Sequence, residues 1–228
     1  MCERVKNIYV IVFDVDGTLT PIRSSWQFIH IILNTIHRVH SYARLFLDGI
    51  ITYDEWIALE VSMWKGLHSD TVRRILEAIP WRSGIEEIAN LVKKYKDRAM
   101  IIAVSGGFDY LCERAVKELG FDAHLCVKLQ INEGRLTGFA SDYPDYDGKG
   151  RILLDFLNDI GVDIGRAKLI CVGDNINDIN LFEVCDIAIA FCANENVKEY
   201  ADIIINTCNV RFLARLLDEL LVYTPNST

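Results

Sequence analysis

The chain has 228 residues, of which 51% are apolar, and its 32 acidic side chains outnumber 24 basic ones to give a formal net charge of −8. The apolar content predicts a sizeable core and excludes bulk disorder. The acidic balance argues against nucleic acid or an anionic membrane as the main partner. No apolar run approaches a membrane span, and the N-terminus has no signal-peptide pattern, so we expect a cytoplasmic protein without a membrane partner.

The seven cysteines are an odd number, form no CxxC pair and lie mostly in apolar segments. They are Cys2, Cys112, Cys126, Cys171, Cys185, Cys192 and Cys208. This distribution predicts buried, reduced thiols, as in a cytoplasmic protein.

The first distinctive stretch is Asp14-Val15-Asp16-Gly17-Thr18, which follows the continuous apolar run 8–13. Such a run predicts a buried strand. Two carboxylates then lie at the carboxyl end of that strand, where open α/β sheets place ligands. Taken alone, the same stretch is as typical of a strand followed by an Asx-type turn.

Residues 21–80 have helical periodicity and no strand pattern. Ser24 or Ser25 can cap a first helix whose apolar stripe reaches residue 36, and a second helix is expected over 39–47. Thr52 and Glu55 form a capping box for a helix to about residue 65, and Ser69 can cap a fourth, over 70–79. We therefore expect a small helical domain at 21–80, inserted into a core made of 1–20 and 81–228.

From residue 81 onward strands alternate with helices, which predicts a parallel sheet with helices on both faces. Strands are expected at 99–104, 168–172, 187–191 and 203–205, with a weak strand at 124–127 and a β-hairpin over 129–139. Helices are expected from a Ser83–Glu86 capping box to 96, and over 108–119, 149–161, 178–184, 197–200 and 210–222.

Polar clusters follow three of the predicted strands, and Lys149 begins a helix between the last two. They are Asp14 with Asp16, then Ser105-Gly106-Gly107, then Asp174 with Asn177 and Asp178. If the first strand lies between the strands that end at Ser105 and Asp174, all three clusters meet at a topological switch point.

The residue types at this edge predict phosphoryl transfer. Asp14, Asp16 and Asp174 can offer oxygen ligands to Mg²⁺, and without a metal they would raise one another's pKa. The Ser105 hydroxyl and the N–H groups of Gly106 and Gly107, at a helix start, suit phosphate oxygens, and Lys149 adds a cation. The residues alone leave open whether Asp14 or Asp16 is the nucleophile.

In order and placement these motifs resemble those of the haloacid dehalogenase-like (HAD-like) phosphatases. The matching motifs are Asp14 to Thr18, Ser105, Lys149 and Gly173 to Asp178. Further stretches at 104–109, 134–138 and 189–193 look like the phosphoserine phosphatase subgroup. The resemblance implies a Rossmann-like HAD core of α/β class, with the helical insertion after the first strand acting as a cap domain.

The resemblance implies a Mg²⁺-dependent phosphatase that hydrolyses a small phosphorylated metabolite through an aspartyl-phosphate. Asp14 would be the nucleophile, and Asp16 would protonate the leaving alcohol and then activate water. Asp14, Asp174 and the Asp16 carbonyl would bind Mg²⁺. The remaining implied roles are phosphate binding by Ser105, Gly106, Asn177 and Lys149, and orientation of Lys149 or the metal waters by Asp178.

The sequence departs from the subgroup in the cap. There a carboxylate and an arginine bind the ammonium and carboxylate of phosphoserine, whereas the matching positions here are Arg23 and Glu60, with the charges exchanged. This exchange predicts a different leaving group, or an ion pair between Arg23 and Glu60. Trp26 is expected in the cap core or, as the alternative, against the substrate.

Several other functions remain as alternatives. Phosphoserine phosphatase and a phosphotransferase using the same intermediate both fit the motifs. A phospho-accepting receiver domain is about half this length and lacks a helical insertion, and a catalytically silent scaffold is disfavoured by the intact motif set.

Overall fold

The central strand β1 (Tyr9–Phe13) is buried along its whole length and pairs in parallel with β2 (Ala99–Phe108) on one side and β5 (Lys168–Gly173) on the other. The computed structural model describes residues 9–142, 144 and 148–222. Its seven-stranded sheet has the order β4-β3-β2-β1-β5-β6-β7. The outer strands are β3 (Ala123–Asn132), β4 (Arg135–Ser141), β6 (Ile187–Phe191) and β7 (Ile203–Ile205), and only the β3–β4 pair is antiparallel.

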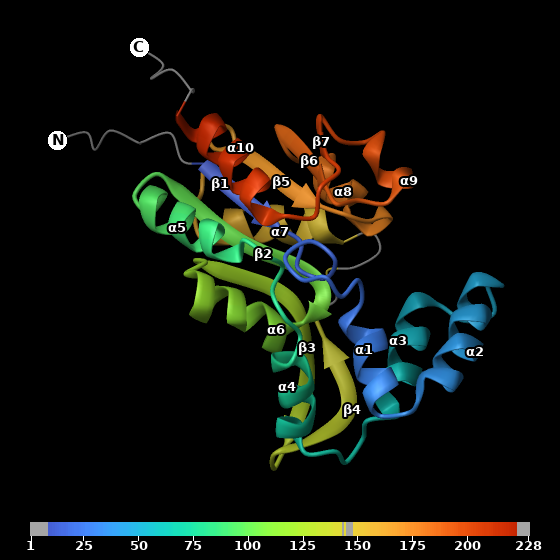
Figure 1. Cartoon of the computed structure of the whole chain (residues 1–228). Helices are drawn as coiled ribbons and strands as arrows, with labels where there is room; N and C mark the ends of the chain where they lie inside the picture. The colour runs from blue at the N-terminus through green and yellow to red at the C-terminus, as the bar shows by residue number, and fades with distance from the viewer. Residues whose placement is uncertain (1–8, 143, 145–147, 223–228) are drawn as a thin grey trace.

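Helices cover both faces of the sheet because side chains of a strand point alternately to its two faces. Tyr9, Ile11 and Phe13 pack on the side of α5 (Ile85–Tyr95), α6 (Asp109–Arg114) with its continuation η1 (Ala115–Leu119), and α10 (Val210–Val222). Val10 and Val12 pack on the side of α7 (Lys149–Asp159) and α8 (Ile179–Phe182). The expected α/β class, a mainly parallel sheet between two helical layers, is confirmed (Figure 1).

The segment between β1 and α5 is helical. It consists of α1 (Ser25–Ile32), α2 (Ile36–Leu47), α3 (Tyr53–Ser62) and α4 (Ser69–Glu77), of which α1, α2 and α3 group beside the sheet in Figure 1. Backbone bonds join the loop after α3 to β4, with N···O distances of 2.8 Å from Gly66 to Leu136 and 2.9 Å from Leu136 to Leu67. The division into a core and a cap domain remains our prediction.

Three local expectations need correction. The first helix ends at Ile32 rather than near 36, because Asn34 adopts a left-handed φ of 55° and α2 begins at Ile36. The Ser83–Glu86 capping box does not form, since the N-cap of α5 is Gly84 with φ 88°. The weak strand at 124–127 and the first arm of the hairpin are one strand, β3. The capping box of Thr52 and Glu55 on α3 is confirmed.

The cysteine expectation is wrong for the six cysteines that the structure describes. Disulfides join Cys112 to Cys126, Cys171 to Cys185 and Cys192 to Cys208; the seventh, Cys2, lies outside the described residues. The sequence showed apolar surroundings and an odd count but not which thiols the fold brings together. The cysteines therefore no longer support a cytoplasmic location.

Within the described part of the chain, no helix combines the length and apolar character needed to cross a lipid bilayer.

Candidate active site

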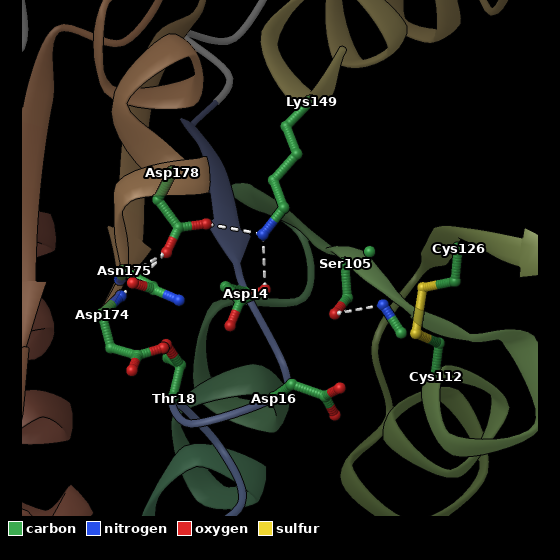
Figure 2. A network of polar contacts seen from close by, with 12 residues as sticks. Asp14, Asp16, Thr18, Ser105, Cys112, Cys126, Lys149, Asp174, Asn175 and Asp178 are labelled. Carbon is green, nitrogen blue, oxygen red and sulfur yellow. Dashed lines mark hydrogen bonds and ion pairs between the residues drawn. A yellow bond between two sulfur atoms is a disulfide. The ribbon is translucent and has the colours of Figure 1, made fainter. Parts of the chain in front are cut away.

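The three polar clusters meet at one edge of the sheet, as the switch-point argument predicts. Phe13 is in register with Ala103 on β2 and with Val172 on β5, so the residues that follow these positions share that edge. The Asp14 backbone N–H donates to the Val172 carbonyl at 2.9 Å, which fixes Asp14 as β1 ends. Figure 2 shows the side chains of Asp14, Ser105 and Asp174 around this point.

Lys149 is the first residue of α7, and its ammonium lies between two carboxylates. Its Nζ donates to Asp14 Oδ1 at 2.7 Å and to Asp178 Oδ1 at 2.6 Å, and all three side chains are buried. A buried ammonium is tolerated only where carboxylates compensate for its lost hydration. The predicted proximity of Lys149 to Asp14 and Asp178 is therefore found.

The carboxyl groups of Asp14 and Asp174 resist ionisation. Burial, opposed by Lys149 but reinforced by Asp178 and Asp174, raises the pKa of Asp14 well above its ordinary value. Burial and then the charge of Asp178 raise the pKa of Asp174 to about 7, against the lowering effect of Arg23. Burial is the main cause of both shifts and the neighbouring carboxylates add to it, so additional positive charge would stabilise the ionised cluster.

The turn after β1 approaches Asp174 closely. Gly17 has a left-handed φ of 84°, and a Cβ at this position would lie 2.5 Å from Asp174 Oδ2. The Thr18 hydroxyl donates to Asp174 Oδ1 at 3.3 Å. Glycine meets both demands, the positive φ and the absence of a side chain, and so lets the carboxylate lie against the turn.

Asp178 organises the loop after β5. Its Oδ2 accepts the backbone N–H groups of Asp174 and Asn175 at 2.9 and 3.0 Å, while Oδ1 accepts from Lys149. Asn177 lies next to it on the short helix η2 (Ile176–Asp178) and is partly buried. Asp178 thereby fixes both Lys149 and the loop that carries Asp174.

The acidic cluster fits a metal ion. Asp14, Asp174 and Asp178 each offer a carboxylate oxygen, and these oxygens lie within 4.8 Å of one another. Buried carboxylates with raised pKa values are the donor set that a hard divalent cation stabilises. Both Asp178 oxygens accept hydrogen bonds, from Lys149 and two backbone N–H groups, and both Asp174 oxygens accept from Thr18 and Arg23. Asp16, predicted to contribute its carbonyl, is two residues from Asp14 at the same turn.

The segment predicted to bind phosphate has a different local structure from the one expected. Ser105, Gly106 and Gly107 belong to β2, and α6 begins only at Asp109, so the expected position at a helix start is wrong. The strand continues because β2 pairs with β3 as far as Phe108, across an irregularity in register. Ser105 Oγ accepts the Gly107 N–H at 3.1 Å within the irregular segment 105–108 of β2, which we call the Ser105 loop and which lies beside Asp14 (Figure 2).

The start of α1 lies against the acidic turn and the Ser105 loop. The Ser25 N–H donates to Asp16 Oδ2 at 2.7 Å, and Trp26 Nε1 donates to the Gly106 carbonyl at 2.8 Å. The Trp26 ring packs on Phe108, with 4.4 Å between the ring centroids. Trp26 thus joins the helical segment to the Ser105 loop.

Arg23 and Glu60 do not pair with each other, which corrects one sequence expectation. Arg23 Nη1 lies 2.7 Å from Asp174 Oδ2, and Glu60 Oε2 lies 3.3 Å from His30 Nε2, where both side chains are buried. Sequence reasoning aligned these positions with substrate-binding residues but gave no means of finding their partners.

Two residues at the site were not identified from the sequence. Arg82 donates to the carbonyls of Gly17 at 2.5 Å and Thr18 at 3.0 Å, and so braces the turn that carries the aspartates. Ser25 was considered only as a helix cap, although its N–H holds Asp16. The sequence signal that could have identified Arg82 is its position, as a basic residue, where the chain passes from the helical insertion back into the core.

Comparison with known proteins decides the family. The haloacid dehalogenase-like hydrolase family model matches residues 11–183, which include all the clusters described above. The chain belongs to this family.

In sequence, the chain is 29% identical over 214 residues to a phosphoserine phosphatase of Methanocaldococcus jannaschii, covering 93% of this chain and 99% of the relative. It is 31% identical to a phosphoserine phosphatase of Archaeoglobus fulgidus, covering 91% of this chain but 59% of the relative.

Solved structures show the same likeness. A phospho-aspartyl intermediate analogue of a phosphoserine phosphatase superposes with a TM-score of 0.73 at 27% identity, covering 92% of this chain and 99% of that one. A substrate-bound phosphoserine phosphatase gives 0.73 at 27% identity, covering 94% and 99%. The protein is thus a HAD-like hydrolase of the phosphatase type.

Proposed function

We propose that the protein hydrolyses the phosphate monoester of a small metabolite, with Asp14 as the nucleophile. The observation that carries the proposal is the buried contact of 2.7 Å between Lys149 Nζ and Asp14 Oδ1 at the switch point of the sheet. One oxygen of Asp14 is thereby fixed, and the carboxylate is held in one orientation. The likeness to a phosphatase solved as a phospho-aspartyl intermediate analogue supports the same assignment.

In the proposed first step, an Asp14 carboxylate oxygen attacks phosphorus, and the bond from phosphorus to the ester oxygen breaks. Asp16 gives its proton to the departing alkoxide, which leaves as a neutral alcohol. In the second step water attacks the same phosphorus and transfers a proton to Asp16. Phosphate leaves and the Asp14 carboxylate is restored, so the atoms and charges balance.

The surrounding residues have positioning and electrostatic roles in this proposal. Lys149 neutralises charge that accumulates on Asp14 and the phosphoryl oxygens, and Asp178 keeps Lys149 in place. Ser105, Gly106 and Asn177 hold phosphoryl oxygens in this proposal. The contact of Asp16 with the Ser25 N–H, 2.7 Å long, orients the acid–base carboxylate from the start of α1.

We propose Mg²⁺ as the metal, held by Asp14, Asp174 and the Asp16 carbonyl. When bound, it supplies positive charge to the phosphoryl oxygens and the attacking carboxylate. The fit rests on the raised pKa values and the spacing of the acidic cluster.

The experiment is a phosphatase assay with p-nitrophenyl phosphate and a panel of phosphorylated metabolites that includes phosphoserine. We expect Mg²⁺-dependent turnover that a chelator stops and that Asp14→Asn abolishes. Asp218→Asn, which alters an exposed ion pair with Lys94 between α10 and α5, is the matched control and should retain activity. Absence of metal-dependent turnover across the whole panel would refute the proposal.

Phosphoserine itself is the second candidate, because the relatives named above are phosphoserine phosphatases. The replacement of the subgroup's charges by Arg23 and Glu60 favours another leaving group. Preferential hydrolysis of phosphoserine in the panel would establish the second candidate. A phosphorylated product formed when acceptor alcohols are added would instead establish phosphotransfer. A cytoplasmic location also remains a proposal, which cell fractionation can test.

A further inference from the structure

Arg23 binds one of the carboxylates that suit the metal. Its Nη1 lies 2.7 Å from Asp174 Oδ2, and its Nη2 donates to the Cys192 carbonyl at 3.2 Å. The Arg23 side chain is 46% exposed, whereas that of Asp174 is 1% exposed. Arg23, a partly exposed cation in the connection between β1 and α1, therefore contacts the buried carboxylate of Asp174, a candidate metal ligand.

The charges around the cluster show what Arg23 does there. Lys149 forms ion pairs with Asp14 and Asp178, at 2.7 and 2.6 Å, whereas Asp174 forms one with Arg23 at 2.7 Å. Arg82, the other guanidinium close by, donates to the backbone carbonyls of Gly17 and Thr18. Arg23 thus contacts Asp174 directly and, together with the charge of Lys149, offsets the burial of the Asp174 carboxylate.

The same oxygen cannot serve a guanidinium at 2.7 Å and a divalent cation at coordination distance without bringing two positive charges within a few ångströms. At that separation their repulsion in a largely buried site is substantial. The other oxygen of Asp174 already accepts from Thr18 and lies against Gly17. Metal coordination by Asp174 and the Arg23 contact therefore oppose each other.

We propose that Arg23 competes with the divalent cation for Asp174, so that cation binding displaces the guanidinium from Oδ2. This inference rests on the cation site of the proposed function. Arg23 directly precedes Ser24, the N-cap of α1, and Ser25 and Trp26 hold the start of α1 on Asp16 and Gly106. Displacement of Arg23 consequently links occupation of the metal site to the way the helical segment lies on the sheet.

The test is isothermal titration of Mg²⁺ into the metal-stripped full-length protein, without substrate. We expect Arg23→Gln to bind Mg²⁺ about tenfold more tightly than the wild type, because a competing cation is gone. Arg23→Lys should fall between them, since it keeps the charge without the planar fork. Arg211→Gln removes the same charge from an exposed pair with Glu86 and should leave the affinity unchanged.

A second measurement follows Arg23 in the wild type, in case Arg23→Gln fails to fold. With ¹⁵N-labelled arginine, the side-chain Nε–H signal that is missing from Arg23→Lys is assigned to Arg23. We expect Mg²⁺ to shift this signal and to raise its mobility.

Unchanged or weaker Mg²⁺ binding by Arg23→Gln, or an Arg23 signal that does not respond to Mg²⁺, would overturn the competition. If the wild type and every variant fail to bind Mg²⁺, the failure lies instead in the proposed metal site.

Discussion

Lys149 Nζ and Asp14 Oδ1 form a fully buried ion pair, 2.7 Å long, in which the ammonium also bonds Asp178 at 2.6 Å. The pair joins the first residue of α7 to the end of β1, which are 135 positions apart in the chain. It therefore contributes to both the fold and the proposed chemistry.

We predict that Lys149→Met destabilises the protein by about 3–5 kcal/mol and abolishes phosphatase activity, because it leaves two buried carboxylates without their cation. The free energy of unfolding is measured by urea denaturation at neutral pH. Lys94→Met is the matched control: Lys94 contacts Asp218 at the same short distance of 2.6 Å, but both side chains are exposed, so little change is expected. Equal effects of the two substitutions would contradict the stabilising role of the buried Lys149 ion pairs.

The contact between Gly17 and Asp174 leads to a second prediction. Gly17→Ala should lower stability by about 2 kcal/mol or more, because it adds left-handed strain and drives a Cβ into the carboxylate. Gly49→Ala introduces comparable strain at φ 69° with no atom within 4 Å of the added Cβ. Thermal unfolding of both variants separates strain from contact. If Gly17→Ala loses activity and Gly49→Ala does not, displacement of Asp174 is the cause of the loss.

Sequence reasoning located the site because strand ends can be predicted from local patterns. The apolar run before Asp14, the run before Ser105 and the run before Asp174 identify β1, β2 and β5, and the parallel topology then brings the clusters together. Side-chain partners could not be predicted in the same way. Arg23 contacts Asp174, 151 positions away, because of the way the helical segment packs on the sheet, and no local pattern encodes that packing.

Loop conformations and disulfides fall outside local patterns for the same reason. Gly106 and Gly107 read as a helix start, but pairing with β3 extends the strand through them. The cysteine pairs are 14 or 16 positions apart, and only the tertiary fold brings their sulfurs together.

A third prediction concerns pH and Asp109, whose side chain is partly buried at the start of α6. Burial raises the pKa of Asp109 from an ordinary 3.8 to about 6, against the lowering effect of the Tyr110 N–H bond. The folded state thus holds a proton that the unfolded state has lost, so stability falls as the pH rises from about 4 to about 6 and the full cost persists above that.

Asp109→Asn removes this ionisation while keeping an oxygen that can accept the Tyr110 N–H. We expect it to raise the free energy of unfolding by about 1 kcal/mol at about pH 8, because solvent partly screens the half-buried charge, and to have almost no effect at about pH 4. Urea denaturation at both pH values provides the measurement. A gain that is the same at both pH values would show that ionisation of Asp109 is not its source.

The last prediction concerns the disulfides. Thiol titration of the unfolded, unreduced protein should detect one free cysteine, because three disulfides consume six of the seven. Each closes a loop of 14 or 16 positions, for which chain entropy predicts about 3 kcal/mol of stabilisation. Reduction should therefore lower the melting temperature markedly. The double variant with Cys112→Ala and Cys126→Ala should lose about one such contribution and become less sensitive to reductant, whereas seven free thiols would contradict the pairing altogether.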